Sequence, residues 1–502
     1  MTSHKNELAE ARRRIDTAFD PKLLEQAGHR LADMLGEHLG KIEKGQGDVL
    51  NWREPQDNID EAARLDRSIE TGEPLEEFAR LVKLMLSRGL NIHNPRYIGH
   101  QVPAPVPLAG LFDAVGSVTN QVMAIYEMGP WSTSVEHAMI GELGSIIGWP
   151  RGEFSGLVTH GGTLANLTAL LTARNVSLGD AWEKGVPAGA NRPVLVAHGE
   201  AHYSIVRAAG VLGLGTEQVV HAELDERRRI DPRKLDETLA RLKQENRPVV
   251  AVAACACATP IGAFDPLEEI AEVCRRHGVW LHIDAAHGGA ACLSEKNKHL
   301  VAGLDQADSV VLDAHKMLFV PGLCAFVFYR NKDHRFEAFR QDAPYLFDPS
   351  APGLADFDSG LKTVECTKRA AAFGLWGVWS MFGRQLFADM VDVTFDMGKT
   401  FYEKLSEADD FEPLHRPECN IVAFRHIPRE LREASPEELG IFQLDLRREI
   451  VRSGKFYIVP TRKDDIGALR TTIINPLTTP DHLDQLLDTL RQEGRRLLDR
   501  FA

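Results

Sequence analysis

The 502 residues exceed one ordinary domain, and 44% hydrophobic with 26% charged residues is the composition of a globular chain, not of a disordered or membrane-spanning one. A formal net charge of −14 argues against nucleic acid or an anionic membrane as a partner, because both select clustered Lys and Arg. Seven scattered cysteines without zinc-type spacing predict reduced thiols and no metal site.

Residues 1–95 are predicted to form a helical arm. PKLLEQAGHRLADMLGEHLGKI and LEEFARLVKLMLSRGL repeat apolar residues at intervals of three and four. The start, MTSHKNELAEARRRID, lacks the apolar core of a signal peptide, and no apolar run has the length of a membrane helix, so we predict a cytoplasmic protein. An arm with little core of its own needs a surface to pack on, and a second subunit would provide one.

The middle of the chain predicts an α/β fold with a mostly parallel sheet. From residue 155 to 330, the β-rich runs RPVLVAH, RPVVAVAACACA and VWLHID alternate with amphipathic helices. Asp265 is expected to cap a helix that has Pro266 at its first position and ends at Gly278. Asp231 is expected to cap another helix in the same way.

The chain beyond this sheet predicts a long loop and a smaller domain. Residues 340–362 are rich in Asp, Pro and Gly without any period, and loops of this length are usually functional or disordered. A helical stretch follows, and then strands near NIVAFRH and ALRTTIINP. The predicted parts are therefore a helical arm (1–95), a large α/β domain (96–370) and a small C-terminal α/β domain (371–502).

Two apolar runs break into polar residues that suit pyridoxal phosphate chemistry. VWLHIDAAHGGA ends its strand at Asp284, and SVVLDAHKMLFVPG leads to Lys316. If the strands are neighbours, the carboxylate and the amine meet at one sheet edge. An ionised Asp can pair with a protonated pyridine nitrogen, and a lysine can form an imine once burial favours loss of its proton. Taken alone, Asp284 would also be an ordinary turn residue, and Lys316 would be an ordinary residue of a surface loop.

Further features accompany this pair. THGGTLANLTALLTAR predicts a Gly-rich turn that leads into a helix. The first amides of this helix and the Thr163 hydroxyl could bind a phosphate. Gly-rich turns of this kind are also common where no phosphate binds. Ala286 and the small residues around it would let a flat ring approach the backbone. His202 follows RPVLVAH and could stack on a planar cofactor, although a lone histidine often has a structural role.

The ordered set GGTLAN, AHYSIVRAAG, HIDAAHGG and DAHKML resembles the group II PLP-dependent decarboxylases, the family of glutamate, cysteine sulfinate and aromatic amino acid decarboxylases. The resemblance runs from about residue 90 to the end and includes NPRYIG, IYEMGPWSTSVE and LRTTIINPLTT. It implies the PLP-dependent transferase fold of type I, pyridoxal 5'-phosphate as cofactor and a homodimer with sites at the interface. The implied activity is that of a lyase of amino acid metabolism, which decarboxylates an L-amino acid to an amine and CO2.

The resemblance also implies roles for single residues. Lys316 would bind the cofactor as an imine, Asp284 would hold the pyridine nitrogen, and His202 would stack over the ring. Gly162 and Thr163 would contact the phosphate. Asp313 and His315 would lie beside the lysine, and Ala286 near the ring. Cys255 stands where many relatives have Thr near the ring oxygen. Arg470 would face the substrate carboxylate or form a structural ion pair, and His100 would lie in the pocket wall.

One departure from the family pattern leaves the product open. ADFDSGLKTVEC places Phe357 where decarboxylases of the family commonly carry a Tyr that is assigned to protonating the carbon left by CO2. A phenyl ring has no proton to give. Members with Phe there are associated with oxygen-dependent conversion of the amino acid to an aldehyde, although Tyr345 or His202 could provide the proton. A related PLP carbon–carbon lyase is a further alternative, as is a binding module, which the intact lysine and carboxylate oppose.

Overall fold

The structure, a computed structural model, describes residues 2–64, 73–189, 191–339, 356–463 and 466–499. The chain forms two compact units, one made of residues 1–98, 445–458 and 477–502 and the other of residues 99–444 and 459–476. The predicted division into an arm and two domains stays a prediction. None of the described helices combines the length and the apolar character needed to cross a membrane.

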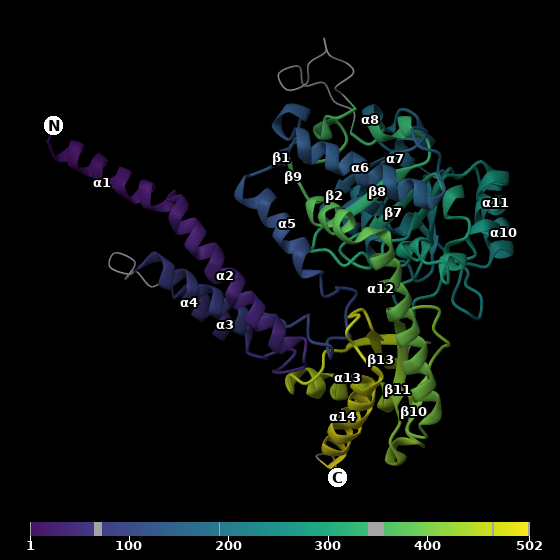
Figure 1. Cartoon of the computed structure of the whole chain (residues 1–502). Helices are drawn as coiled ribbons and strands as arrows, with labels where there is room; N and C mark the ends of the chain where they lie inside the picture. The colour runs from purple at the N-terminus through teal and green to yellow at the C-terminus, as the bar shows by residue number, and fades with distance from the viewer. Residues whose placement is uncertain (1, 65–72, 190, 340–355, 464–465, 500–502) are drawn as a thin grey trace. The chain divides into compact units, whose positions relative to one another are not determined.

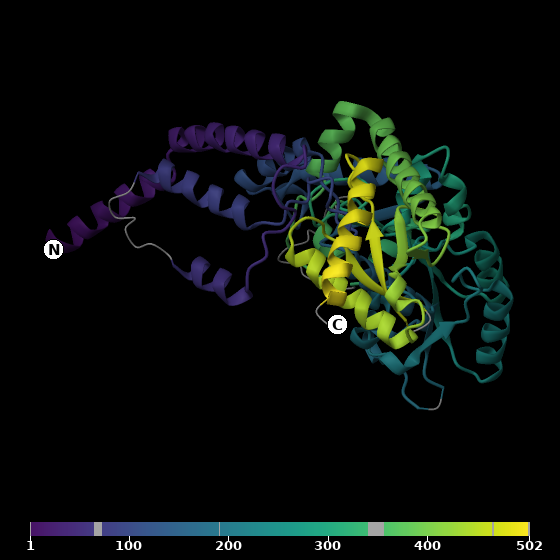
Figure 2. The same ribbon diagram turned by 90° about the horizontal axis from the view of Figure 1, so that it is seen from below.

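The first unit is helical, as the sequence predicts for the N-terminal region. Helices α2 and α4 lie side by side in both views (Figures 1 and 2). Asp20 caps α2 by accepting a hydrogen bond from the Lys22 amide, and Arg96 donates to the carbonyl oxygens of Gly45 and Gly47. The helices of this unit are α1 (Thr2–Ala18), α2 (Pro21–Ile42), α3 (Pro55–Ala63), α4 (Pro74–Arg88) and α14 (Pro480–Asp499).

The second unit is built on a seven-stranded sheet in the order β2-β8-β7-β6-β5-β3-β4. Strands β4, β3, β5, β6 and β7 run parallel, while β8 pairs antiparallel with both β7 and β2. This mixed, mostly parallel sheet confirms the predicted α/β fold. Its strands are β2 (Ser155–Thr159), β3 (Val194–His198), β4 (Val219–Ala222), β5 (Val249–Cys255), β6 (Leu281–Asp284), β7 (Ser309–Asp313) and β8 (Ala325–Tyr329).

Both faces of this sheet are covered. Every residue of β3, β6, β7 and β8 is buried, and successive side chains of a strand point to opposite faces. Helix α7 (Gly162–Leu178) contacts β2, β5, β6, β7 and β8, and α9 (Tyr203–Val211) packs beside α7. Helices α6 (Pro130–Ile147) and α11 (Leu267–His277) also pack on the sheet. The nearly continuous apolar runs in the sequence reflect this double coverage.

One predicted helix cap is wrong. Helix α11 begins after Pro266 and ends at Gly278, which has a φ of 65°, but Asp265 makes no cap. The buried Asp265 carboxylate accepts instead from the amides of Cys255, at 2.8 Å, and Ile230, at 2.7 Å. It therefore holds the end of β5, where an uncompensated buried amide would be costly. Asp231 does cap α10 (Pro232–Gln244) as predicted.

A second, four-stranded antiparallel sheet completes this unit, in the order β10-β11-β13-β12. The strands that the sequence predicts near NIVAFRH and ALRTTIINP are β11 and β13. The long helix α12 bends at Gly383, whose φ is 71°. The other α-helices and β-strands of the described residues are α5 (Pro107–Val118), β1 (Val122–Met123), α8 (Ala181–Lys184), β9 (Lys368–Arg369), α12 (Phe373–Glu407), β10 (Phe411–Pro413), β11 (Ile421–His426), α13 (Pro436–Arg452), β12 (Val459–Lys463) and β13 (Ile466–Thr472).

Candidate active site

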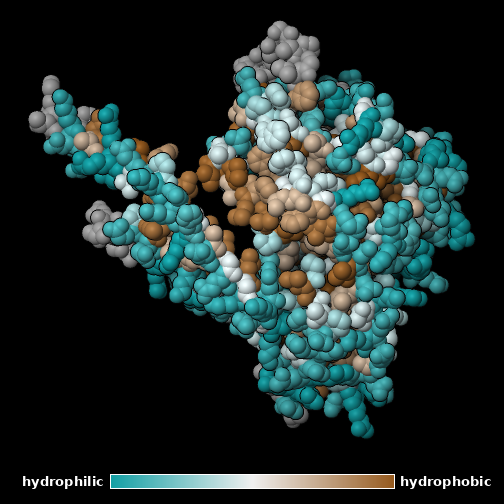
Figure 3. All heavy atoms as spheres, viewed as in Figure 1, coloured by the Kyte–Doolittle hydropathy of each residue, from teal (hydrophilic) through white to brown (hydrophobic). Residues whose placement is uncertain are grey.

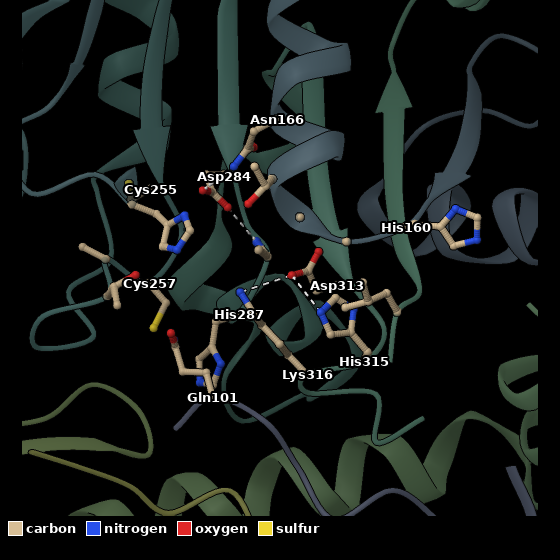
Figure 4. Close-up of a pocket in the computed structure, with 18 residues that line it drawn as sticks. Gln101, His160, Asn166, Cys255, Cys257, Asp284, His287, Asp313, His315 and Lys316 are labelled. Atoms are coloured by element: carbon tan, nitrogen blue, oxygen red, sulfur yellow. Dashed lines mark hydrogen bonds and ion pairs between the residues drawn. The ribbon is translucent and has the colours of Figure 1, made fainter. Parts of the chain in front are cut away.

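The carboxyl ends of the parallel strands meet at one edge of the large sheet and border a cavity of about 390 Å³ (Figure 4). Asp284 is the last residue of β6 and Asp313 the last residue of β7. Cys255 ends β5 and is the register partner of Asp284. His202 follows β3 as the N-cap of α9. The prediction that a carboxylate and a lysine share one sheet edge agrees with this geometry, because Lys316 also lines the cavity.

Most of the predicted site residues border this cavity, and several further residues do so as well. The predicted residues in its wall are Gly162, Thr163, His202, Cys255, Asp284, Ala286, Asp313, His315 and Lys316. Those that sequence reasoning missed are Gln101, His160, Gly161, Asn166, Cys257, Ala258, Thr259, His287 and Leu323.

Four predicted residues are not in the wall. His100 is exposed, and its neighbour Gln101 borders the cavity instead. Arg470, in β13, does not line the cavity, but its Nη1 donates to the carbonyl oxygen of the wall residue Thr259 at 2.7 Å. Phe357 packs against other aromatic rings, and Tyr345 lies outside the described residues.

The Asp284 carboxylate is held by two donors. Its Oδ1 accepts from the Ala286 amide at 3.1 Å, and its Oδ2 accepts from Asn166 Nδ2 at 2.9 Å. Asn166 stands on α7 and also donates to Ser204 Oγ at 3.0 Å. A carboxylate that accepts two hydrogen bonds keeps its orientation. The fixed carboxylate can therefore face a cationic ring nitrogen.

A chain of hydrogen bonds continues from Asn166 into the core. Because the Asn166 amide nitrogen donates to Asp284, its oxygen accepts from His282 Nε2 at 3.0 Å. His282 Nδ1 must then accept from the Ser309 hydroxyl at 2.9 Å, while Trp280 Nε1 donates to Ser309 Oγ. Burial lowers the pKa of His282 to about 4, although Asp284 opposes that shift, so the ring is neutral. Each donor in this chain points toward Asp284.

Lys316 lies between two carboxylates. Its Nζ is 3.2 Å from Asp313 Oδ2, and His315 Nε2 is 3.6 Å from the same oxygen (Figure 4). Burial lowers the pKa of the Lys316 ammonium, but Asp313 and Asp284 raise it by more, so the pKa lies above its ordinary value. The sequence-based expectation that burial would favour the neutral amine is wrong here, because it neglected these charges.

The Gly-rich turn before α7 is shaped by backbone constraints. Gly161 is the N-cap of α7 with a φ of 105°, a conformation that disfavours side chains. A Cβ on Gly162 would lie 2.7 Å from Asp313 Oδ2, so this close approach also requires glycine. The first amides of a 17-residue helix have no intrahelical acceptor and form a natural anion site beside Thr163.

Two histidines in the wall are neutral, with defined hydrogen bonds. His202 Nδ1 accepts from the Ser204 amide at 3.3 Å, so Nε2 carries its proton, and burial lowers its pKa. His287 Nε2 donates to Asn420 Oδ1 at 2.9 Å because the Asn420 amide nitrogen donates to the Ile473 carbonyl oxygen. Burial lowers the pKa of His287 to about 3, and its buried Nδ1 has no partner among the described residues.

These residues fit pyridoxal 5'-phosphate. Asp284 would hold the pyridine nitrogen, the turn at Gly162 and Thr163 would hold the phosphate, and Lys316 would bind the aldehyde carbon. The fit depends on the fixed carboxylate, on the first amides of α7 beside Thr163 and on the amine in the same cavity. The individual roles remain proposals.

Comparison with known proteins gives consistent matches. The family model described as the pyridoxal-dependent decarboxylase conserved domain matches residues 69–427. The acidic amino acid decarboxylase GADL1 of Mus musculus is 30% identical over 455 residues, covering 89% of this chain and 82% of that protein. The crystal structure of mouse CSAD is 28% identical with a TM-score of 0.86, covering 95% of this chain and 99% of that chain. The Oryza sativa TDC structure with PLP and tryptamine is 20% identical with a TM-score of 0.86, covers 95% and 99% of the two chains, and shows the shared fold alone.

Substitution of Asn166 should weaken cofactor binding. Asn166→Ala removes a donor to the Asp284 carboxylate. Such a bond contributes about 1.5 kcal/mol, so we expect roughly tenfold weaker binding of pyridoxal phosphate in an absorbance titration. Asn175→Ala is the control, since Asn175 is a buried residue of the same helix that donates to the Glu337 carbonyl oxygen. Equal cofactor affinity in Asn166→Ala and the wild type would refute the assigned role.

Proposed function

The chain belongs to the pyridoxal-dependent decarboxylase family, and on that premise we propose that it converts an acidic L-amino acid to CO2 and the corresponding amine. The observation that carries the proposal is the presence of Lys316 and Asp284 in one cavity at the carboxyl edge of the sheet. When bound, pyridoxal phosphate supplies an electron sink for the electron pair that the departing carboxylate leaves behind. The protein supplies charge, orientation and protons.

The proposed roles follow from the geometry of the wall. Asp284 keeps its negative charge in place through the bonds from Ala286 and Asn166. Lys316 has to pass a proton on before its amine can act as a nucleophile, and Asp313 Oδ2, 3.2 Å from its Nζ, can accept that proton. His202 carries a proton on Nε2 and is therefore a donor in the wall. In this proposal, these residues bind and orient the reactants and exchange protons with them.

The acidic substrate class is supported by the relatives and by charge. GADL1 of mouse is described as an acidic amino acid decarboxylase. In this chain, the cations of Lys316 and Arg470 both lower the pKa of His287 in the wall, so two positive charges act on this part of the cavity. Arg470 Nε is buried without a partner among the described residues. A substrate carboxylate near Arg470 would satisfy a fixed-charge donor.

An amine is favoured over an aldehyde as the product. The aldehyde alternative depends on Phe357, but this ring does not line the cavity around Lys316. Phe357 instead packs against Tyr126, with ring centroids 5.6 Å apart, and against His137, at 5.0 Å. Within one chain, the described residues therefore place no Phe357 contact at the cavity. The carbon–carbon lyase alternative receives no support from the relatives described above.

We further propose a cytoplasmic homodimer. Leu111, Val115 and Val118 form an apolar stripe on one face of α5, and each is more than half exposed, at 55%, 57% and 62%. Figure 3 shows apolar side chains gathered over this helix. Contiguous exposed apolar surface usually marks an interface, and a second copy is the partner that the proposed dimer requires. The seven cysteines, all free, support a reducing compartment.

A substrate panel tests the proposed reaction. With pyridoxal phosphate bound, we expect acidic L-amino acids to give CO2 and amine in equal amounts, with kcat/KM at least about tenfold above that for neutral or aromatic ones. Carbon dioxide, amine, oxygen and peroxide should be followed together. Lys316→Ala is the control and should abolish turnover and the visible absorbance of the bound cofactor. Turnover of aromatic substrates alone would contradict the acidic class.

Substitution of Phe357 tests the product. Phe357→Tyr should leave the product unchanged and alter the rate by no more than about twofold, because the ring is partly exposed and outside the cavity. An oxygen electrode and an aldehyde assay would compare the two enzymes. Oxygen consumption by the wild type that disappears in Phe357→Tyr would instead establish the oxidative reaction.

Light scattering after size exclusion tests the dimer. We expect about twice the chain mass of 55.7 kDa. Val115→Glu places a charge in the apolar stripe and should shift the protein toward monomer. Val211→Glu is a matched control, since Val211 is an exposed valine on α9. A wild-type monomer, or equal dissociation by both variants, would count against this interface.

A further inference from the structure

Two cysteines from distant parts of the chain meet at the cavity wall. Cys257 follows β5 and lines the cavity, while Cys419 lies just before β11 and is only 1% exposed. Their Sγ atoms are 3.6 Å apart, which is direct contact for two sulfur atoms. The proposed decarboxylation makes no use of this pair.

The backbone around both thiols is constrained. Cys257 has a φ of 83°, in the left-handed region that side chains rarely adopt, and a Cβ on Gly288 would lie 2.8 Å from its Cβ. Cys419 Sγ donates to the Gly262 carbonyl oxygen at 3.7 Å. A Cβ on Gly262 would lie 2.6 Å from Cys419 Sγ, and Gly262 itself has a φ of 76°. The two glycines thus leave the space in which the sulfurs meet.

The pair is connected to the proposed catalytic groups. Asn420, next to Cys419, donates to the sulfur of Met317 at 3.6 Å and accepts from His287. Met317 directly follows Lys316. On the other side, Thr259 lies two residues after Cys257, and its carbonyl oxygen accepts from Arg470. A shift of either sulfur would therefore reach groups on both sides of the cavity.

We propose that Cys257 and Cys419 form a redox modification site, at which a peroxide entering the cavity converts the two thiols to a disulfide and reversibly inactivates the enzyme. The Cys257 sulfur attacks a peroxide oxygen, the O–O bond breaks, and a sulfenic acid and water or an alcohol result. The Cys419 sulfur then displaces the hydroxyl as water and forms the S–S bond. Two electrons pass from the thiols to the peroxide, and the thiol protons leave in the products.

The expected rate is slow, which suits a response to sustained oxidation. Burial and the neighbouring Cys419 raise the pKa of the Cys257 thiol, although the Lys316 ammonium partly opposes the rise. The thiolate is the attacking form, so few pairs react during a brief exposure. Cys257 nevertheless reacts first, because it borders the cavity through which a peroxide enters and Cys419 does not.

The bond would disturb the site. A disulfide has an S–S length of about 2.05 Å, so the sulfurs must approach by about 1.5 Å. A displacement of about 1 Å at catalytic groups can cost roughly a hundredfold in rate, so we expect kcat/KM to fall by roughly tenfold or more. This loss of activity rests on the proposed function, whereas formation of the disulfide does not.

The test uses the enzyme with pyridoxal phosphate bound. Hydrogen peroxide is added, free thiols are alkylated, and the protein is digested without reductant for mass spectrometry. We expect a cross-linked peptide pair containing Cys257 and Cys419, an altered cofactor absorbance spectrum, and recovery of the spectrum and of activity with dithiothreitol. The exposed Cys366 reports whether peroxide has reached the protein, and the buried Cys274 serves as a second internal control.

The variant Cys419→Ser separates the switch from general damage. It keeps the side-chain volume, cannot form the disulfide and should retain basal activity and the cofactor spectrum. With hydrogen peroxide this variant should give no Cys257–Cys419 cross-linked peptide, and it should lose less activity than the cross-linked wild type. If Cys419→Ser folds poorly, Cys419→Ala is the substitute. Oxidation of Cys366 without a Cys257–Cys419 cross-link, or a cross-link that leaves the cofactor spectrum unchanged, would overturn the proposal. Absence of decarboxylation with an intact cross-link would count against the proposed function alone.

Discussion

A single buried charge, the Asp284 carboxylate, sets the conditions for the rest of the site. Removing a carboxylate from water is costly unless hydrogen bonds and an opposite charge compensate for it. The Ala286 amide and Asn166 provide the hydrogen bonds, and Asn166 is itself oriented by the neutral ring of His282. Because this chain joins β6, β7 and α7, the carboxylate is positioned by the core of the unit. A cationic cofactor nitrogen would complete the compensation.

Helix α7 consequently has two tasks. Its first amides, after Gly161 and Gly162, are available to an anion, and one turn further its Asn166 side chain fixes Asp284. A single rigid helix thus sets the distance between the proposed phosphate site and the proposed partner of the ring nitrogen. Lys316 enters from the opposite side of the cavity through the turn after β7, where Asp313 holds its ammonium. The three groups are placed by elements that are themselves buried.

The sequence predicted those site residues that stand where strands end. Asp284 and Lys316 follow apolar runs, and the geometry of parallel strands brings such endings together. Asn166 was missed because it lies inside a helix, and its partner Asp284 is 118 residues away. Gln101 borders the cavity whereas the predicted His100 does not, since a segment with four prolines has no period that would indicate which side chain faces inward. Tertiary charges, which a sequence does not locate, likewise decide the pKa of Lys316.

The cavity is closed by a seam between the large and the small sheet of the same unit. Along it, Asn420 accepts from His287, Arg470 donates to the Thr259 carbonyl oxygen, and Cys419 contacts Cys257. The seam is closely packed at Gly262, because only a hydrogen atom fits there beside the Cys419 sulfur. A closely packed interface transmits displacement instead of absorbing it. A bond between Cys257 and Cys419 would therefore act on a seam that also holds Arg470, which we assign to the substrate, and His287 of the cavity wall.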